Sequence, residues 1–126
     1  MENKEFARQL EARTKNFAIS IIKLSAQLPD TSEARTIRRQ ITRSATSIGA
    51  NYREANRARS KADFTSRASI CESEASETIY WLEIINEMQW IEKQKIGSIM
   101  QECSEILAIF TSIGKTLKTL DHSRSL

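Results

Sequence analysis

Residues 35–61 read RTIRRQITRSATSIGANYREANRARSK, and the fold and function expected for the chain follow from this stretch. It holds eight basic residues and one acidic residue, Glu54, so its net charge is +7, whereas the whole chain carries only +3. All its basic residues except Lys61 are arginines, whose planar guanidinium groups suit forked hydrogen bonds to phosphate. The excess of positive charge is therefore concentrated in this stretch, and nearly all of it is carried by arginine.

A helical turn of about 100° per residue divides this stretch into faces. The face predicted to enter a core carries Ala34, Ile37, Ile41, Ala45, Ile48, Tyr52 and Ala55. The opposite face carries what we call the arginine row: Arg35, Arg39, Arg43, Arg53 and Arg57. A strip along one flank consists of Ser44, Ser47, Asn51 and Ala58. Side chains this small let a neighbouring helix approach closely.

The arginine row has two interpretations. A run of charge on a helix is often a solvated surface. The alternative is a face that binds phosphate groups. Acidic residues are nearly absent from the row, whereas a face that serves solubility alone usually mixes both signs. The charge pattern therefore favours a phosphate-binding face.

Outward from this stretch, the chain is patterned as long helices. Its 126 residues include only 3 glycines and 1 proline, which leaves few signals for strands and tight turns. Apolar residues at three-four spacing predict helices over 3–28, 32–58, 60–89 and 93–119. Pro29 ends the first helix, and Ser60 with Asp63 forms an approximate capping box for the third. Candidate caps for the second helix are Asp30, Thr31 and Ser32. We predict one all-α domain, residues 1–126, folded as an antiparallel up-down-up-down four-helix bundle.

The third helix has apolar residues on two sides. Opposite its core stripe lies a strip that we call the outer strip of 60–89: Ile70, Glu74, Glu77, Trp81, Ile84 and Met88. An exposed patch of this kind predicts a subunit interface, in which the two glutamates could meet arginines of a neighbouring subunit. The alternative is that Trp81, being large, reaches round to the edge of the core.

The residue types that catalysis requires are scarce. The one histidine, His122, is near the C-terminal end, so neither a di-iron site nor a histidine base can be assembled. The chain has no glycine-rich phosphate loop, and Cys71 and Cys103 lack the paired spacing of a zinc site and are expected to be buried free thiols. We therefore expect no enzyme activity, no metal and no cofactor. With no apolar run long enough for a membrane span, we expect a cytoplasmic protein without a membrane partner.

Residues 39–85 resemble the 23S rRNA intervening-sequence protein family of small bacterial four-helix bundles. The resemblance rests on Arg39, Arg43, Ser44, Ser47, Ile48, Asn51, Glu54, Ala55, Arg59, Ser60, Asp63, Phe64, Glu74, Ser76, Glu77, Trp81 and Leu82. It implies a ring-like homopentamer. The accessory variability determinant proteins of diversity-generating retroelements, which look like the same fold, add the implication of nucleic-acid binding and of a reverse-transcriptase-like protein partner.

Two functions from different classes follow. The first is a non-enzymatic homo-oligomer, with pentamer as the expected state, that binds RNA or DNA through the arginine row. The second is a protein–protein interaction scaffold, in which the arginines form salt bridges with Glu74 and Glu77 of a neighbouring subunit or with an acidic partner. The two functions differ in whether the arginines are consumed inside the assembly or remain available to a polyanion.

Overall fold

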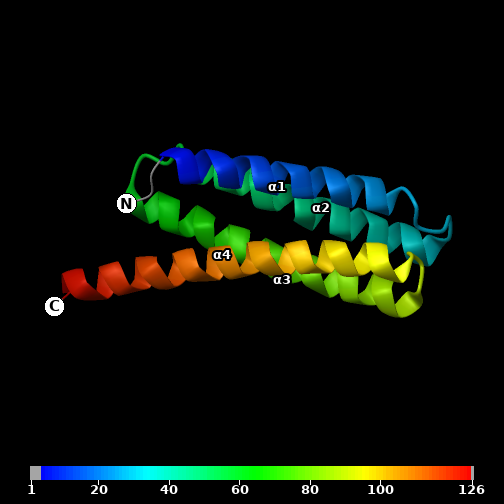
Figure 1. The fold of residues 1–126 in the computed structure, drawn as a ribbon. Coiled ribbons are helices and arrows are strands. Elements are labelled where there is room, and N and C mark those ends of the chain that lie inside the picture. Colours follow the sequence, from blue (N-terminus) through cyan, green and yellow to red (C-terminus); the bar gives the residue numbers. More distant parts are fainter. Residues whose placement is uncertain (1–3, 126) are drawn as a thin grey trace.

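The computed structural model describes residues 4–125, and for residues 121–125 it describes the backbone alone. Four helices follow one another along the chain: α1 (Lys4–Ser25), α2 (Ser32–Ala55), α3 (Lys61–Met88) and α4 (Lys93–Ser125). Short connections reverse the chain direction after each helix, so that neighbouring helices run antiparallel (Figure 1). The predicted all-α four-helix bundle is confirmed.

Two of the helix starts use the side chains that the sequence indicated. Thr31 is the N-cap of α2, and its hydroxyl accepts a hydrogen bond from the backbone amide of Ala34 at 3.1 Å. Ser60 caps α3 in the same way and accepts from the amide of Asp63 at 3.0 Å. At the other end of α3, Gln89 adopts a left-handed conformation with φ 58°, which ends that helix.

The ends of three helices differ from the predicted ranges, and α2 ends at Ala55 rather than at residue 58. The first helix ends at Ser25 rather than at residue 28, because the chain turns there before reaching Pro29. The last helix continues to Ser125, beyond the predicted end at residue 119. The side chain of His122 and the whole of Leu126 lie outside the described residues.

The four helices surround one core, to which all of them contribute buried residues. Consecutive helices pack closely, whereas the contact between α1 and α4 is looser. Arg13 bridges this looser seam from α1, with hydrogen bonds to Glu102 at 2.7 and 2.8 Å and to Glu105 at 2.6 Å on α4. The central members of the core are Ile21, Ile41, Ile48, Tyr52, Leu82, Ile85, Ile106 and Phe110.

A few polar side chains are buried among these apolar residues. Thr14, Ser25, Ser44 and Thr78 are all nearly inaccessible, and each hydroxyl has a hydrogen-bond partner. Throughout the described residues, no buried side-chain nitrogen or oxygen is left without a partner. In residues 4–125, none of the helices is both long enough and apolar enough to span a bilayer.

Candidate nucleic-acid interface

The arginine row lies on the solvent-facing side of α2. The apolar face of α2 is buried in the core, as the helical periodicity predicted, except that Ile37 is half-buried; Ile41 and Ile48 are inaccessible to solvent. All five arginines of the row are exposed, four of them on α2 itself and Arg57 in the turn that follows it. The helix therefore positions the row by burying the residues opposite to it.

Arg43 is the most heavily paired arginine of the row. One guanidinium nitrogen lies 3.3 Å from Glu74 Oε1, and the other forms a salt bridge with Glu77. The hydrogen bond to Glu77 raises the pKa of Arg43 and, in return, lowers the pKa of the Glu77 carboxyl. Both glutamates therefore bind an arginine of their own chain.

The remaining arginines of the row are paired weakly or not at all. Arg35 donates to Asp30 at 2.6 Å, but the Asp30 side chain is 90% exposed, and such surface pairs contribute about 0–1 kcal/mol. Arg53 lies 3.8 Å from a Glu11 oxygen. Within the described residues, the side chains of Arg39 and Arg57 have no hydrogen bond or ion pair.

Arg38, which the sequence did not place in the row, has a structural role at its edge. Its guanidinium group donates to the backbone oxygens of Ser25 at 2.9 Å and Leu28 at 3.0 Å. Ser25 is the last residue of α1 and Leu28 lies in the turn that follows, so Arg38 braces the connection between α1 and α2. The contact explains how α1 can end at Ser25 and holds the Arg38 guanidinium group in a fixed position.

Beside Arg38, the first half of α2 forms a shallow, open groove of about 480 Å³. We call it the arginine groove, and its lining consists of Arg35, Arg38, Arg39, Thr42 and Arg43. No carboxylate lines it, although Asp30, Glu74 and Glu77 bind two of its arginines from outside.

The four guanidinium groups around the groove differ in their partners. Those of Arg38 and Arg43 are anchored by the fold, that of Arg35 has an exposed partner, and that of Arg39 is unpaired. The guanidinium group of Arg38 turns towards α1 and that of Arg43 towards α3, so the groove itself is lined mainly by the aliphatic stems of the arginines. Sequence periodicity could not detect the contribution of Arg38, since it points towards α1 rather than along the row.

The outer strip predicted on α3 is partly exposed. Ile70 and Met88 are 39% and 52% exposed, whereas Ile84 is half-buried. Trp81 is also half-buried against the core, and its indole nitrogen donates to Glu77 at 3.1 Å. Tyr80, beside the strip, packs edge-on against Trp81 with a ring separation of 5.0 Å and remains exposed. The strip therefore presents less apolar surface than its sequence indicated, because Trp81 reaches the edge of the core.

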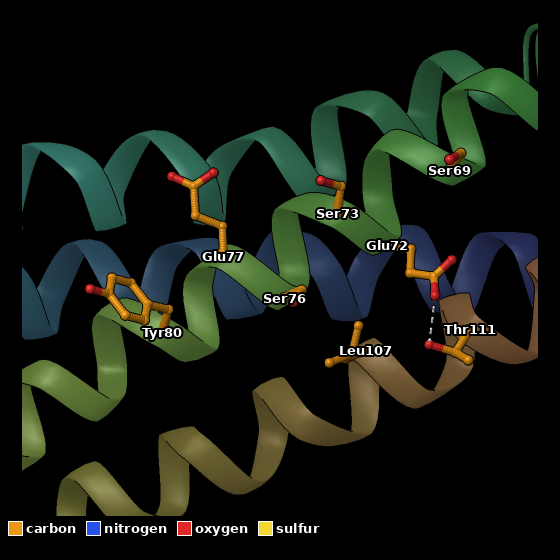
Figure 2. A pocket seen from close by; sticks show the side chains of 8 residues that line it. All are labelled: Ser69, Glu72, Ser73, Ser76, Glu77, Tyr80, Leu107 and Thr111. Atoms are coloured by element: carbon orange, nitrogen blue, oxygen red, sulfur yellow. Dashed lines mark hydrogen bonds between the residues drawn. The ribbon is translucent and has the colours of Figure 1, made fainter.

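A second groove, of about 710 Å³, runs between α3 and α4 (Figure 2). It is lined by Ser69, Glu72, Ser73, Ser76, Glu77, Tyr80, Leu107 and Thr111. Figure 2 shows Glu77 turned towards α2 and Glu72 turned towards Thr111, which donates to it at 3.0 Å. The negative charge of this groove makes it unsuitable for phosphate, in contrast to the arginine groove.

The two cysteines are buried in the core. Burial raises the pKa of the Cys71 and Cys103 thiols to about 12, as expected for structural cysteines in an apolar core. Among the residues whose side chains are described, no three His, Cys, Asp or Glu side chains cluster closely enough to share a metal ion. The exposed arginines of α2 are thus the distinctive chemical feature of this surface.

Taken together, the fold and this surface define a small helical-bundle protein with an arginine-rich exposed helix. The model of the 23S rRNA-intervening sequence protein family matches residues 7–112, and the chain belongs to that family. The resemblance expected from residues 39–85 is confirmed.

A solved structure supports the same assignment. It is a protein of unknown function from the S23 ribosomal protein family of Bacteroides thetaiotaomicron, determined at 1.70 Å resolution. This protein is 38% identical in sequence and superposes with a TM-score of 0.78 over 84% of the present chain and 98% of its own. Comparison with curated proteins gives no match.

Proposed function

We propose that this protein is a non-enzymatic, homo-oligomeric nucleic-acid-binding protein whose contact surface is the exposed face of α2. The exposed arginine row is the observation that carries the proposal, because it presents five arginines on one solvent-facing side and no carboxylate lines the groove in its first half. Guanidinium groups on such a face can form forked hydrogen bonds with phosphate. Protein–phosphate contacts of this kind supply most of the sequence-independent affinity for nucleic acids.

The arginines contribute unequally in this proposal. Arg39 and Arg57 have no side-chain partner among the described residues, so their hydrogen-bonding capacity is available to phosphate. Arg35 and Arg53 have exposed or distant partners that phosphate can replace at little cost. Arg43 is held by two carboxylates of its own chain and contributes least.

The scaffold function requires the row to be consumed in contacts with acidic groups of other subunits or partners. Glu74 and Glu77, the acids expected to serve that purpose, are already bound to Arg43 within the chain. This observation favours an arginine row that is available to a polyanion. Exposed Ile70 and Met88 on α3 support self-association through a different surface, so an oligomer would repeat the row rather than cover it.

The test compares the double variant Arg39→Gln/Arg57→Gln with Lys115→Gln/Lys118→Gln, which removes the same charge from exposed positions on α4. Binding of a structured RNA and a single-stranded DNA is measured at several salt concentrations, with the mass of each complex. Each lost phosphate contact lowers the slope of log affinity against log salt by about 0.7 to 0.9. We expect the arginine variant to lose about two contacts and the lysine variant to retain its slope. Equal slopes in both variants, or no binding by the unmodified protein at low salt, would overturn the proposal.

A further inference from the structure

We infer that the arginine row recognises the phosphate backbone of paired nucleic acid, such as a double-stranded stem, in preference to an unpaired strand. This inference rests on the proposed nucleic-acid-binding function and specifies the class of ligand for the same surface. It depends on two properties of α2: the row lacks an aromatic side chain on which bases could stack, and its charges lie along a straight helix.

The first property concerns the aromatic residues. Proteins that bind unpaired strands usually stack successive bases on exposed aromatic rings. Tyr52 is the one aromatic residue in the stretch 35–61, and it is only 1% exposed. Its ring packs edge-on against Phe110 of α4, with centroids 5.4 Å apart, on the core side of α2. Tyr52 therefore faces away from any strand that follows the row.

Other aromatic side chains do not compensate for its burial. Among the described residues, the exposed aromatic side chains are those of Phe6 and Tyr80. Phe6 lies on α1, in the same stripe as the buried Leu10 and Phe17, and Tyr80 lines the acidic groove between α3 and α4. Neither belongs to the face of α2 that carries the row.

The middle of the row is occupied by small side chains. Thr42, Thr46 and Ala50 separate the arginines of the first half of α2 from Arg53. The Thr46 hydroxyl donates to the backbone oxygen of Thr42 at 2.8 Å, so its hydrogen is engaged within the helix. A strand that crosses this region meets methyl groups and guanidinium groups, which can hold phosphates but offer no stacking platform.

The second property is the spacing of the charges. Arg39 and Arg53 belong to one uninterrupted helix, and at 1.5 Å per residue they lie about 21 Å apart along its axis (Figure 1). A duplex presents one phosphate charge per about 1.7 Å of axis, compared with about 3.4 Å for one strand. The denser charge of a duplex releases more counterions for each phosphate that the row neutralises, and without stacking this difference favours the duplex.

The experiment uses three probes with equal numbers of phosphates. They are an RNA hairpin with a short loop, a DNA hairpin of the same sequence, and oligouridine, which remains unpaired. At low salt we expect both hairpins, or the RNA hairpin alone, to bind at least about tenfold more tightly than oligouridine. The two hairpins distinguish a general duplex from RNA geometry. Oligouridine binding as tightly as the hairpins would overturn this inference but leave the proposed function intact, whereas no binding of any probe would overturn both.

A gain-of-function variant provides an independent test. Ala50 is exposed near the middle of the row, so Ala50→Trp supplies the missing stacking surface. One base stacked on an aromatic ring is expected to tighten oligouridine binding about fivefold to a hundredfold. The matched control is Ala108→Trp, at an exposed position on α4. We expect Ala50→Trp to favour oligouridine alone, and the control to favour neither probe. The inference would be contradicted if Ala50→Trp tightened the binding of the hairpin and of oligouridine equally. It would also be contradicted if the variant did not bind oligouridine more tightly.

Discussion

The hydroxyl oxygen of Ser44 on α2 lies 2.8 Å from that of Thr78 on α3, and both side chains are inaccessible to solvent. Thr78 also donates to the backbone oxygen of Glu74 at 2.8 Å, so its own hydrogen is engaged there and its oxygen can accept from Ser44. A directional hydrogen bond within an apolar contact fixes the position of one helix along the axis of the other. It thereby sets the level at which Arg43, next to Ser44, meets Glu74 and Glu77 on α3.

Replacing the two hydroxyls should have unequal effects. Thr78→Val retains the side-chain shape but leaves Ser44 with only the backbone oxygen of Ile41, at 3.4 Å, so we expect a loss of about 1–3 kcal/mol in the free energy of unfolding. Ser44→Ala leaves Thr78 bonded to Glu74 and gains helix propensity, so we expect a smaller loss. Urea titrations of both variants measure the difference. A larger loss for Ser44→Ala would contradict the assigned direction of the bond.

A second prediction concerns the close approach of α1 and α2 at Gly49. A Cβ atom at this position would lie 3.1 Å from the hydroxyl oxygen of Thr14, which is buried and bonded to the Leu10 carbonyl at 2.9 Å. We expect Gly49→Ala to destabilise the protein despite the better helix propensity of alanine. In a Thr14→Ala background the contact is absent, and the same change should stabilise by about 1 kcal/mol. A double-mutant cycle by thermal unfolding provides the measurement, and additive effects would show that the contact is not limiting.

The sequence was sufficient for most of the fold because the chain alternates long apolar stripes with few breaks. Thr31 and Ser60 marked two helix starts correctly, since N-caps depend on the local chain alone. The ends of α1 and α2 were each misplaced by three residues. At the end of α1, Arg38 of α2 binds the carbonyls of Ser25 and Leu28. Local periodicity contains no information about such a contact.

The candidate surface was predictable to a lesser degree. Spacing placed the five arginines on one exposed face. It could not separate the paired Arg43 from the unpaired Arg39, because the carboxylates that bind Arg43 come from another helix. It likewise placed Trp81 on an outer face, whereas the width of the indole brings it against the core. Side-chain reach and pairing across helices are tertiary properties, and they decide which members of a periodic row remain available.

The pairing of Glu77 with Arg43 predicts a specific dependence of stability on pH. Because the hydrogen bond from Arg43 lowers the Glu77 pKa in the folded state, the unfolded chain binds more protons in acid. This contribution to stability is fully present above about pH 4.5, the ordinary value for a glutamate, and is lost as the pH falls through the lower folded pKa. We expect Glu77→Gln to lose less stability between pH 7 and pH 3 than the unmodified protein, as measured by urea unfolding.

The control for this experiment is Glu87→Gln, because Glu87 is exposed on the same helix and has no ion pair among the described residues. This variant should retain the acid dependence of the unmodified protein. If both variants changed the acid dependence equally, the effect would come from net charge rather than from the pair with Arg43.

The buried thiols give a prediction about chemical reactivity. A thiol pKa of about 12 leaves almost no thiolate at pH 8, and the core excludes reagents from Cys71 and Cys103. We expect a thiol reagent such as dithionitrobenzoate to modify neither cysteine in the folded protein and both of them in denaturant. Rapid reaction of either thiol without denaturant would indicate that the core opens around α3 or α4.

The different surroundings of Arg39 and Arg43 should separate binding from stability. Arg39 has no side-chain partner among the described residues, so Arg39→Gln should leave the unfolding free energy nearly unchanged and weaken RNA binding, with a salt slope smaller by about 0.7 to 0.9. Arg43→Gln removes the partner of Glu74 and Glu77, so it should lower stability and leave the salt slope nearly unchanged. Unfolding and salt titrations on both variants measure these effects side by side. If Arg43→Gln reduced the slope as much as Arg39→Gln, then phosphate would displace the two carboxylates, and the whole row would act as one equivalent set of charges.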